Sequence, residues 1–227
     1  MKMVYNGIME FRRNIKWLVC WGILFAGFVV LDSLKLGGMI NYWMDHAASF
    51  AKYGGIILCL VFAMLRRGKD PLLAIAIGLT LLADTLLFWT LQVEAGVLVF
   101  IVAQIFHTIR FSKTRSKSLW STAVIYTLII AYFLYNKIPL IYASAIIYGC
   151  ELLLNVYLSG RVGGLSFVGF LLFLACDVNV GLGYLAMHGI IPFGIATITQ
   201  FLVFIFYLPS QVCIVFGRNE IDKTLIK

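Results

Sequence analysis

Eight apolar stretches recur along the chain, and they constrain its fold more than any other feature. A helix needs roughly 20 mostly apolar residues to cross the hydrocarbon core of a bilayer. Only helices and closed barrels satisfy every backbone polar group in lipid, and these stretches lack the alternation of barrel strands. We therefore predict an all-α integral membrane protein, an eight-transmembrane-helix bundle that forms one membrane domain over residues 1–227. The predicted spans are 15–31, 47–65, 71–91, 95–111, 119–135, 139–158, 163–185 and 193–216.

The composition excludes a soluble domain, because 62% of the residues are hydrophobic and only 12% are charged. A basic N-terminal segment precedes the first apolar stretch, as in a signal peptide. No cleavage site with small residues follows that stretch, so we predict an uncleaved first span. The five cysteines all fall in apolar stretches without CxxC spacing, which favours small buried side chains over a disulfide framework.

The basic residues are distributed unevenly between the predicted connections, although the net charge is +8. With the N-terminus inside, fifteen of the eighteen Lys and Arg residues fall on the inner side. Only Lys35 and Lys137 fall on the outer side, and Lys52 lies within a span. This bias predicts a multi-pass protein of the cell membrane with both termini cytoplasmic. The basic residues then contact anionic lipid head groups, and we expect no nucleic-acid partner.

Two aspartates, Asp84 and Asp177, lie well inside predicted spans that run in the same direction. Counted from the inner end of its span, Asp84 is the fourteenth residue and Asp177 the fifteenth, which places each about 20 Å along a helix. A carboxylate at membrane depth costs roughly 2.5–3.5 kcal/mol, so such residues mark functional sites. Lys52 enters the membrane from the outer side and reaches a similar layer. The alternatives are hydrogen bonds or ion pairs between helices for the aspartates, and a Lys52 side chain extended toward the surface.

Other polar residues within the spans form pairs at helical spacing. Glu151 and Asn155 share one face and predict either a proton relay or a helix-packing contact. Gln104 and His107 share a face of another predicted helix. We interpret His107 as a hydrogen-bonded core histidine and not as a metal ligand, because a zinc site needs three or four ligands. We therefore predict no metal and no other cofactor.

A pattern of residues surrounds both aspartates: Asp84 with Leu86 and Leu87, then Gly96, Phe100 and Ala103, the segment CDVNVGL around Asp177, and finally Tyr207 and Gln211. This pattern resembles the YhhN-like lysoplasmalogenase family, and the resemblance extends from Lys52 to Gln211. The chain departs from the family pattern at Ala83, which replaces Gly, and at Gln104 and His107, which replace His and Tyr. Tyr53 and Gly54 also stand where the family has Pro and Leu after the lysine.

The resemblance implies an eight-helix enzyme that hydrolyses the vinyl ether bond of lysoplasmalogens to a fatty aldehyde and a glycerophospho-alcohol. The implied catalytic residues are Asp84 and Asp177, one as general acid and the other as stabiliser of the cation. Lys52 keeps one aspartate ionised or binds the head-group phosphate, while Tyr207 and Gln211 position water or substrate. Gln104 stands where the family has histidine, and it cannot transfer a proton as histidine does.

Three other functions fit the same sequence. Polar groups at mid-depth also occur in small-molecule or lipid transporters. A different lipid hydrolase is possible on the same scaffold, and so is a structural protein whose aspartates join helices. The expected partners are the lysophospholipid substrate and membrane lipids; the sequence predicts no particular protein partner.

Overall fold

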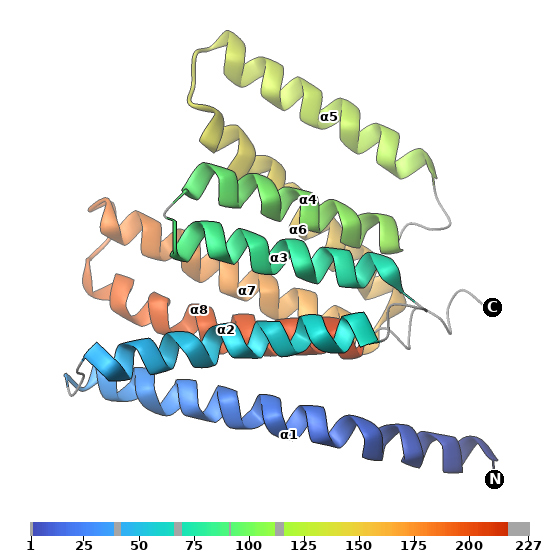
Figure 1. Ribbon diagram of the computed structural model, residues 1–227. Coiled ribbons are helices and arrows are strands. Elements are labelled where there is room, and N and C mark those ends of the chain that lie inside the picture. The colour runs from blue at the N-terminus through green and yellow to red at the C-terminus, as the bar shows by residue number, and fades with distance from the viewer. Residues whose placement is uncertain (1, 39–41, 66–69, 91, 112–115, 218–227) are drawn as a thin grey trace. The chain divides into compact units, whose positions relative to one another are not determined.

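The computed structural model describes residues 2–38, 42–65, 70–90, 92–111 and 116–217. Within these residues the chain forms eight α-helices (Figure 1), which confirms the all-α prediction. They are α1 (Lys2–Leu36), α2 (Tyr42–Leu65), α3 (Pro71–Phe88), α4 (Val93–Phe111), α5 (Ser116–Tyr135), α6 (Leu140–Val162), α7 (Gly164–Met187) and α8 (Gly194–Phe216).

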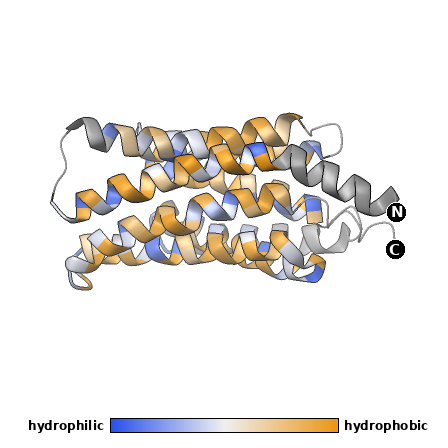
Figure 2. Cartoon of the chain, turned by 90° about the horizontal axis from the view of Figure 1, so that it is seen from below, coloured by the Kyte–Doolittle hydropathy of each residue, from blue (hydrophilic) through white to orange (hydrophobic). Residues whose placement is uncertain are grey.

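Six helical segments among the described residues are long and apolar enough to cross a membrane. They are Ile15–Leu36, His46–Leu65, Val93–Phe111, Ile141–Val162, Gly164–Met187 and Gly194–Phe216. The apolar parts of α3 and α5, Pro71–Leu87 and Ile125–Tyr135, are shorter. Hydrophobic residues predominate along the helices in Figure 2. The protein is therefore a membrane protein with several apolar helices.

The largest difference from the predicted spans concerns α1, which has 35 residues where 15–31 was predicted. The length of an apolar stretch predicts only the part of a helix that lies in lipid. The helix itself can continue beyond that part through good helix formers such as Lys, Met, Glu and Arg. The helix ends at Leu36, and Gly38 follows with a φ of 76°. Asp32 consequently lies inside a helix and not in the long connection 32–46 that the sequence predicts.

Helices α3 and α4 form a tight antiparallel hairpin, and they lie side by side in Figure 1. The turn is closed by backbone hydrogen bonds from Trp89 N to Thr85 O and from Gln92 N to Leu86 O. A Cβ at Gly96 would lie 2.6 Å from Leu87 Cγ, so only glycine allows this approach. Asp84 lies four residues before the end of α3 and is therefore close to this turn.

The chain divides into two compact units, and the division falls within α2, α7 and α8. Unit 1 comprises Met1–Phe62 and Cys176–Leu208, and unit 2 comprises Ala63–Ala175 and Pro209–Lys227. In unit 1 the rings of Phe28 and Phe204 meet edge to face, with centroids 5.9 Å apart. In unit 2, α4 packs against both α3 and α6.

The second unit contains a close contact between α7 and α8. A Cβ at Gly169 would lie 2.8 Å from the backbone nitrogen of Ile214 and 3.0 Å from the carbonyl oxygen of Ser210. Such distances leave no room for a methyl group, because both neighbours are backbone atoms. The glycine therefore sets how closely these two helices approach.

Candidate functional site

Asp84 is buried in α3, with 3% of its surface exposed. It is the fourteenth residue of an 18-residue helix whose other residues are almost all apolar. Proline at the first helical position and Asp70 as N-cap define where α3 starts. They therefore also define how far along the helix Asp84 lies. The predicted burial of this carboxyl group inside an apolar helix is confirmed.

Asp177 lies in α7 and is half-buried. It belongs to unit 1, whereas Asp84 belongs to unit 2. Both side chains interact with other residues. A site shared by the two aspartates stays a prediction.

Lys52 forms an ion pair that the sequence did not predict. Its Nζ lies 2.7 Å from Asp32 Oδ2, and their side chains are 14% and 9% exposed. The same ammonium lies 4.2 Å from the ring centroid of Phe204 and 5.0 Å from that of Phe28. An ammonium over aromatic faces gains roughly 0.5–2 kcal/mol, more as water is excluded. The ion pair joins α1 to α2, and Lys52 is not simply extended toward the surface.

Unit 2 contains a buried polar cluster between α4 and α6, which we call the α4–α6 cluster: Gln104, Thr108, Glu151 and Asn155. All four residues are at most 2% exposed. The Asn155 amide nitrogen donates to Gln104, to the backbone oxygen at 3.0 Å and to Oε1 at 2.9 Å. Thr108 Oγ1 lies 2.7 Å from Glu151 Oε2 and 3.1 Å from Asn155 Oδ1. The Tyr126 hydroxyl of α5 also hydrogen-bonds to Glu151.

His107 follows the cluster on α4 and is 1% exposed. Its ring packs edge to face on Phe170 of α7, with centroids 5.1 Å apart. Burial is as predicted, but Nδ1 accepts or donates no hydrogen bond within the described part of the chain. The expectation of a hydrogen-bonded histidine therefore fails at this atom.

The two residues at the predicted closing motif are both buried. Tyr207 is 4% exposed and its ring contacts Phe204 in unit 1. Gln211 is 1% exposed and lies in unit 2, where its amide nitrogen is 3.4 Å from Ser210 Oγ. Tyr207 therefore shares its aromatic neighbour with Lys52, whereas Gln211 does not.

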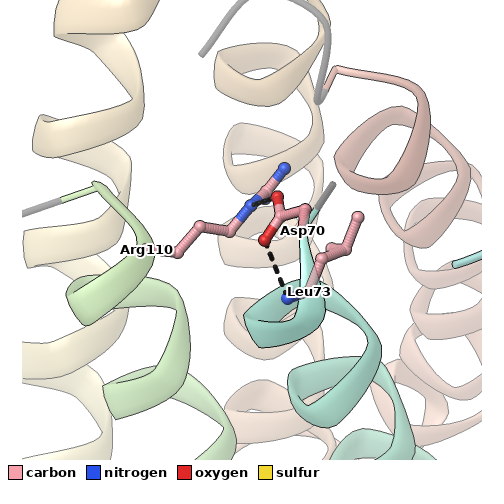
Figure 3. A network of polar contacts seen from close by, with 3 residues as sticks. All are labelled: Asp70, Leu73 and Arg110. Atoms are coloured by element: carbon pink, nitrogen blue, oxygen red, sulfur yellow. Dashed lines mark hydrogen bonds and ion pairs between the residues drawn. The ribbon is translucent and has the colours of Figure 1, made fainter. Parts of the chain in front are cut away.

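Figure 3 shows a second ion pair, at the start of α3. Arg110 Nε on α4 donates to Asp70 Oδ2 at 2.6 Å, and Asp70 Oδ1 accepts from the backbone nitrogen of Leu73 at 3.2 Å. Only 1% of the Arg110 side chain and 8% of the Asp70 side chain are exposed. One carboxylate thus caps α3 and fixes the last turn of α4.

No group of three or more His, Cys, Asp or Glu residues in the described ranges could hold a metal ion. The family model for the YhhN family matches residues 47–218. The chain belongs to the YhhN family. Neither a curated protein nor a solved structure matches the sequence.

The YhhN match contains both aspartates, Lys52, the α4–α6 cluster, Tyr207 and Gln211. It begins at residue 47, so α1 precedes the matched region. The partner of Lys52, Asp32, therefore comes from outside the region that defines the chain as a YhhN protein.

Sequence reasoning missed Asp32, Thr108, Tyr126 and the pair of Asp70 with Arg110. Thr108 follows Gln104 by four residues, and Asn155 follows Glu151 by four residues. Equal spacing on two helices is the one signal that could have suggested this cluster, because residues four apart share a helix face.

Proposed function

We propose that this YhhN protein is a membrane-embedded hydrolase of the lysoplasmalogenase type. It cleaves the vinyl ether bond of a lysoplasmalogen and releases a fatty aldehyde and a glycerophospho-alcohol. Family membership supports the reaction class. The observation that carries the residue assignment is Asp84, a carboxyl group 3% exposed inside an apolar helix.

The reaction needs an acid and an anion. Protonation at the vinyl carbon remote from the ether oxygen gives an oxocarbenium ion. Water then adds to the carbon bound to oxygen, and the resulting hemiacetal loses the glycerophospho-alcohol to leave the aldehyde. The demand resembles that of glycoside hydrolysis, where one carboxylic acid donates a proton and a second carboxylate supports the cation.

Asp84 and Asp177 take these two roles in our proposal. The reaction needs one of them as a protonated acid and the other as an anion, as in enzymes that use two carboxyl groups in different roles. The remaining supporting residues are Lys52, Gln104, His107, Glu151, Tyr207 and Gln211. Lys52 brings an ammonium group from within a predicted span, and its chemistry suits an anionic head group.

We also propose that α3 and α5 cross the membrane with the other six helices, so that both termini are cytoplasmic. The distribution of Lys and Arg supports this topology, because an even number of spans leaves only Lys35 and Lys137 outside. Both aspartates then lie in the outer half of their spans. The site is expected to be reached from the outer leaflet of the cell membrane.

The test is aldehyde release from a lysoplasmalogen by detergent-purified protein, beside Asp84→Asn and Asp177→Asn. Loss of a general acid lowers turnover by roughly 10²–10⁴-fold, so each variant should be nearly inactive. Glu94→Gln is the matched control, since it neutralises an exposed acid in the first turn of α4. Detergent abolishes compartments, so product formation distinguishes an enzyme from a carrier. Equal turnover by wild type and both aspartate variants would end the assignment.

A further inference from the structure

The hydrogen bonds of the α4–α6 cluster constrain where protons lie. A threonine hydroxyl has one proton to donate, while carboxylate and amide oxygens only accept. Thr108 Oγ1 nevertheless lies within hydrogen-bonding distance of two such oxygens, Glu151 Oε2 at 2.7 Å and Asn155 Oδ1 at 3.1 Å. If both neighbours are acceptors, the two contacts compete for a single proton.

The orientation of the Asn155 amide is fixed by its other neighbours. A backbone carbonyl can only accept, so the Asn155 atom 3.0 Å from the Gln104 backbone oxygen is the amide nitrogen. The second proton of that nitrogen is donated to Gln104 Oε1 at 2.9 Å. Asn155 Oδ1 must therefore face Thr108, and exchanging its oxygen and nitrogen would break two contacts to repair one.

Two arrangements remain for Thr108. If it donates to an ionised Glu151, its oxygen and Asn155 Oδ1 face each other as two acceptors. If Glu151 carries a proton, its O–H donates to Thr108, Thr108 donates to Asn155, and every contact has a donor. Asn155 is fully buried and Glu151 is 2% exposed, so bulk solvent does not reach this contact, and in the first arrangement the two acceptors face each other. Buried acceptors without a donor are rare in native structures.

We propose that Glu151 is a protonated carboxylic acid in the folded protein and that its proton sets the direction of a hydrogen-bond chain ending on Gln104. The chain runs from Glu151 through Thr108 to Asn155 and then to Gln104. The carbonyl oxygen of the protonated acid remains for the Tyr126 hydroxyl. Every member of this cluster is then neutral, which suits its place within membrane-spanning helices.

The chain determines which end of the Gln104 amide is available. Its Oε1 is occupied by Asn155, so its Nε2 is turned away from Asn155 as a donor. This part rests on the proposed function: Gln104 presents N–H groups to an oxygen of the lysolipid. Glu151 is then a positioning residue that acts through Thr108 and Asn155.

Infrared difference spectroscopy of the purified protein near neutral pH tests the proton without any substrate. Subtracting the Glu151→Gln spectrum from that of wild type should reveal the C=O stretch of a protonated carboxylic acid. Thr108→Val should shift this band without removing it, and it serves equally well if Glu151→Gln fails to fold. Glu94→Gln is the control and should remove only carboxylate bands. A difference spectrum for Glu151→Gln that contains carboxylate bands and no acid band would overturn the proposal.

Aldehyde release then tests the positioning role. Glu151→Gln keeps a neutral donor at the same place and should retain turnover within about threefold, whereas Glu151→Ala should lose about tenfold or more, the equivalent of one buried hydrogen bond. Equal loss in both variants, with the acid band present in wild type, would refute the positioning role. Absence of turnover in wild type would refute the proposed function, and the infrared result would still decide whether Glu151 is protonated.

Discussion

The ion pair between Arg110 and Asp70 gives the sharpest prediction about stability. Asp70→Ala removes an anion beside a guanidinium that is 1% exposed, and it also removes the acceptor that caps α3. Breaking a buried ion pair from one side costs about 3–5 kcal/mol. Losing an N-cap costs about 1 kcal/mol. We expect Asp70→Ala to lower the free energy of unfolding by the sum of these effects, about 4–6 kcal/mol.

Asp70→Asn separates the two contributions, because asparagine is as good an N-cap as aspartate but carries no charge. It should cost about 1 kcal/mol less than Asp70→Ala. Combining Asp70→Asn with Arg110→Met removes both charges together. The double variant should be less destabilised than the sum of the single variants by about 3 kcal/mol, the upper end for residues in contact.

The measurement is reversible unfolding of the purified protein in mixed micelles of increasing SDS content, followed by circular dichroism. Arg161→Met is the matched control, since Arg161 lies exposed in the last turn of α6. Surface substitutions of this kind usually change stability by at most about 0.5 kcal/mol. A cost for Arg110→Met no larger than that of Arg161→Met would refute the reasoning that this pair stabilises the fold.

Three further predictions concern other parts of the chain. Asp32→Asn should destabilise the protein by about 3 kcal/mol because it leaves the Lys52 ammonium without its anion, and Lys52→Met added to it should restore much of the loss in the same SDS titration. Gly169→Ala should cost about 1–3 kcal/mol, since its Cβ would meet the Ile214 backbone, whereas Gly149→Ala, with nothing within 4 Å of its Cβ, should stabilise α6 by roughly 0.5–1 kcal/mol. Reporter proteins that are active only in the cytoplasm should work when fused to either terminus, and activity at one terminus alone would contradict an even number of spans.

The helices were predictable because a backbone in lipid must bond to itself, so each apolar stretch dictates a helix. Their ends were less predictable. Helix α6 continues to Val162, past the predicted end at 158, because its hydrogen bonds continue until Gly163 adopts a φ of 80°. The only sequence signal for the end of α6 is therefore one glycine, and the length of the apolar stretch does not reveal it.

The partners of the buried polar residues were not predictable in the same way. The sequence marks Lys52 as unusual because it lies within a span, but Asp32 stands just beyond the predicted first span, in a predicted connection. Thr108 gives no signal in the sequence, because a single threonine in an apolar helix costs little and forms no pattern of its own. Its importance depends on α4 packing against α6, a tertiary choice that local sequence does not specify.

Helix α1 is longer than a membrane is thick. Its 35 residues extend about 52 Å at 1.5 Å per residue, whereas a hydrocarbon core is about 30 Å thick. The apolar segment Ile15–Leu36 accounts for the crossing, and the residues before it continue the same helix for about 20 Å. A tilt of about 20° displaces the tip of such an extension sideways by about 7 Å. A bilayer of different thickness changes the tilt that accommodates the helix, and the sideways position of the N-terminal end of α1 changes with it.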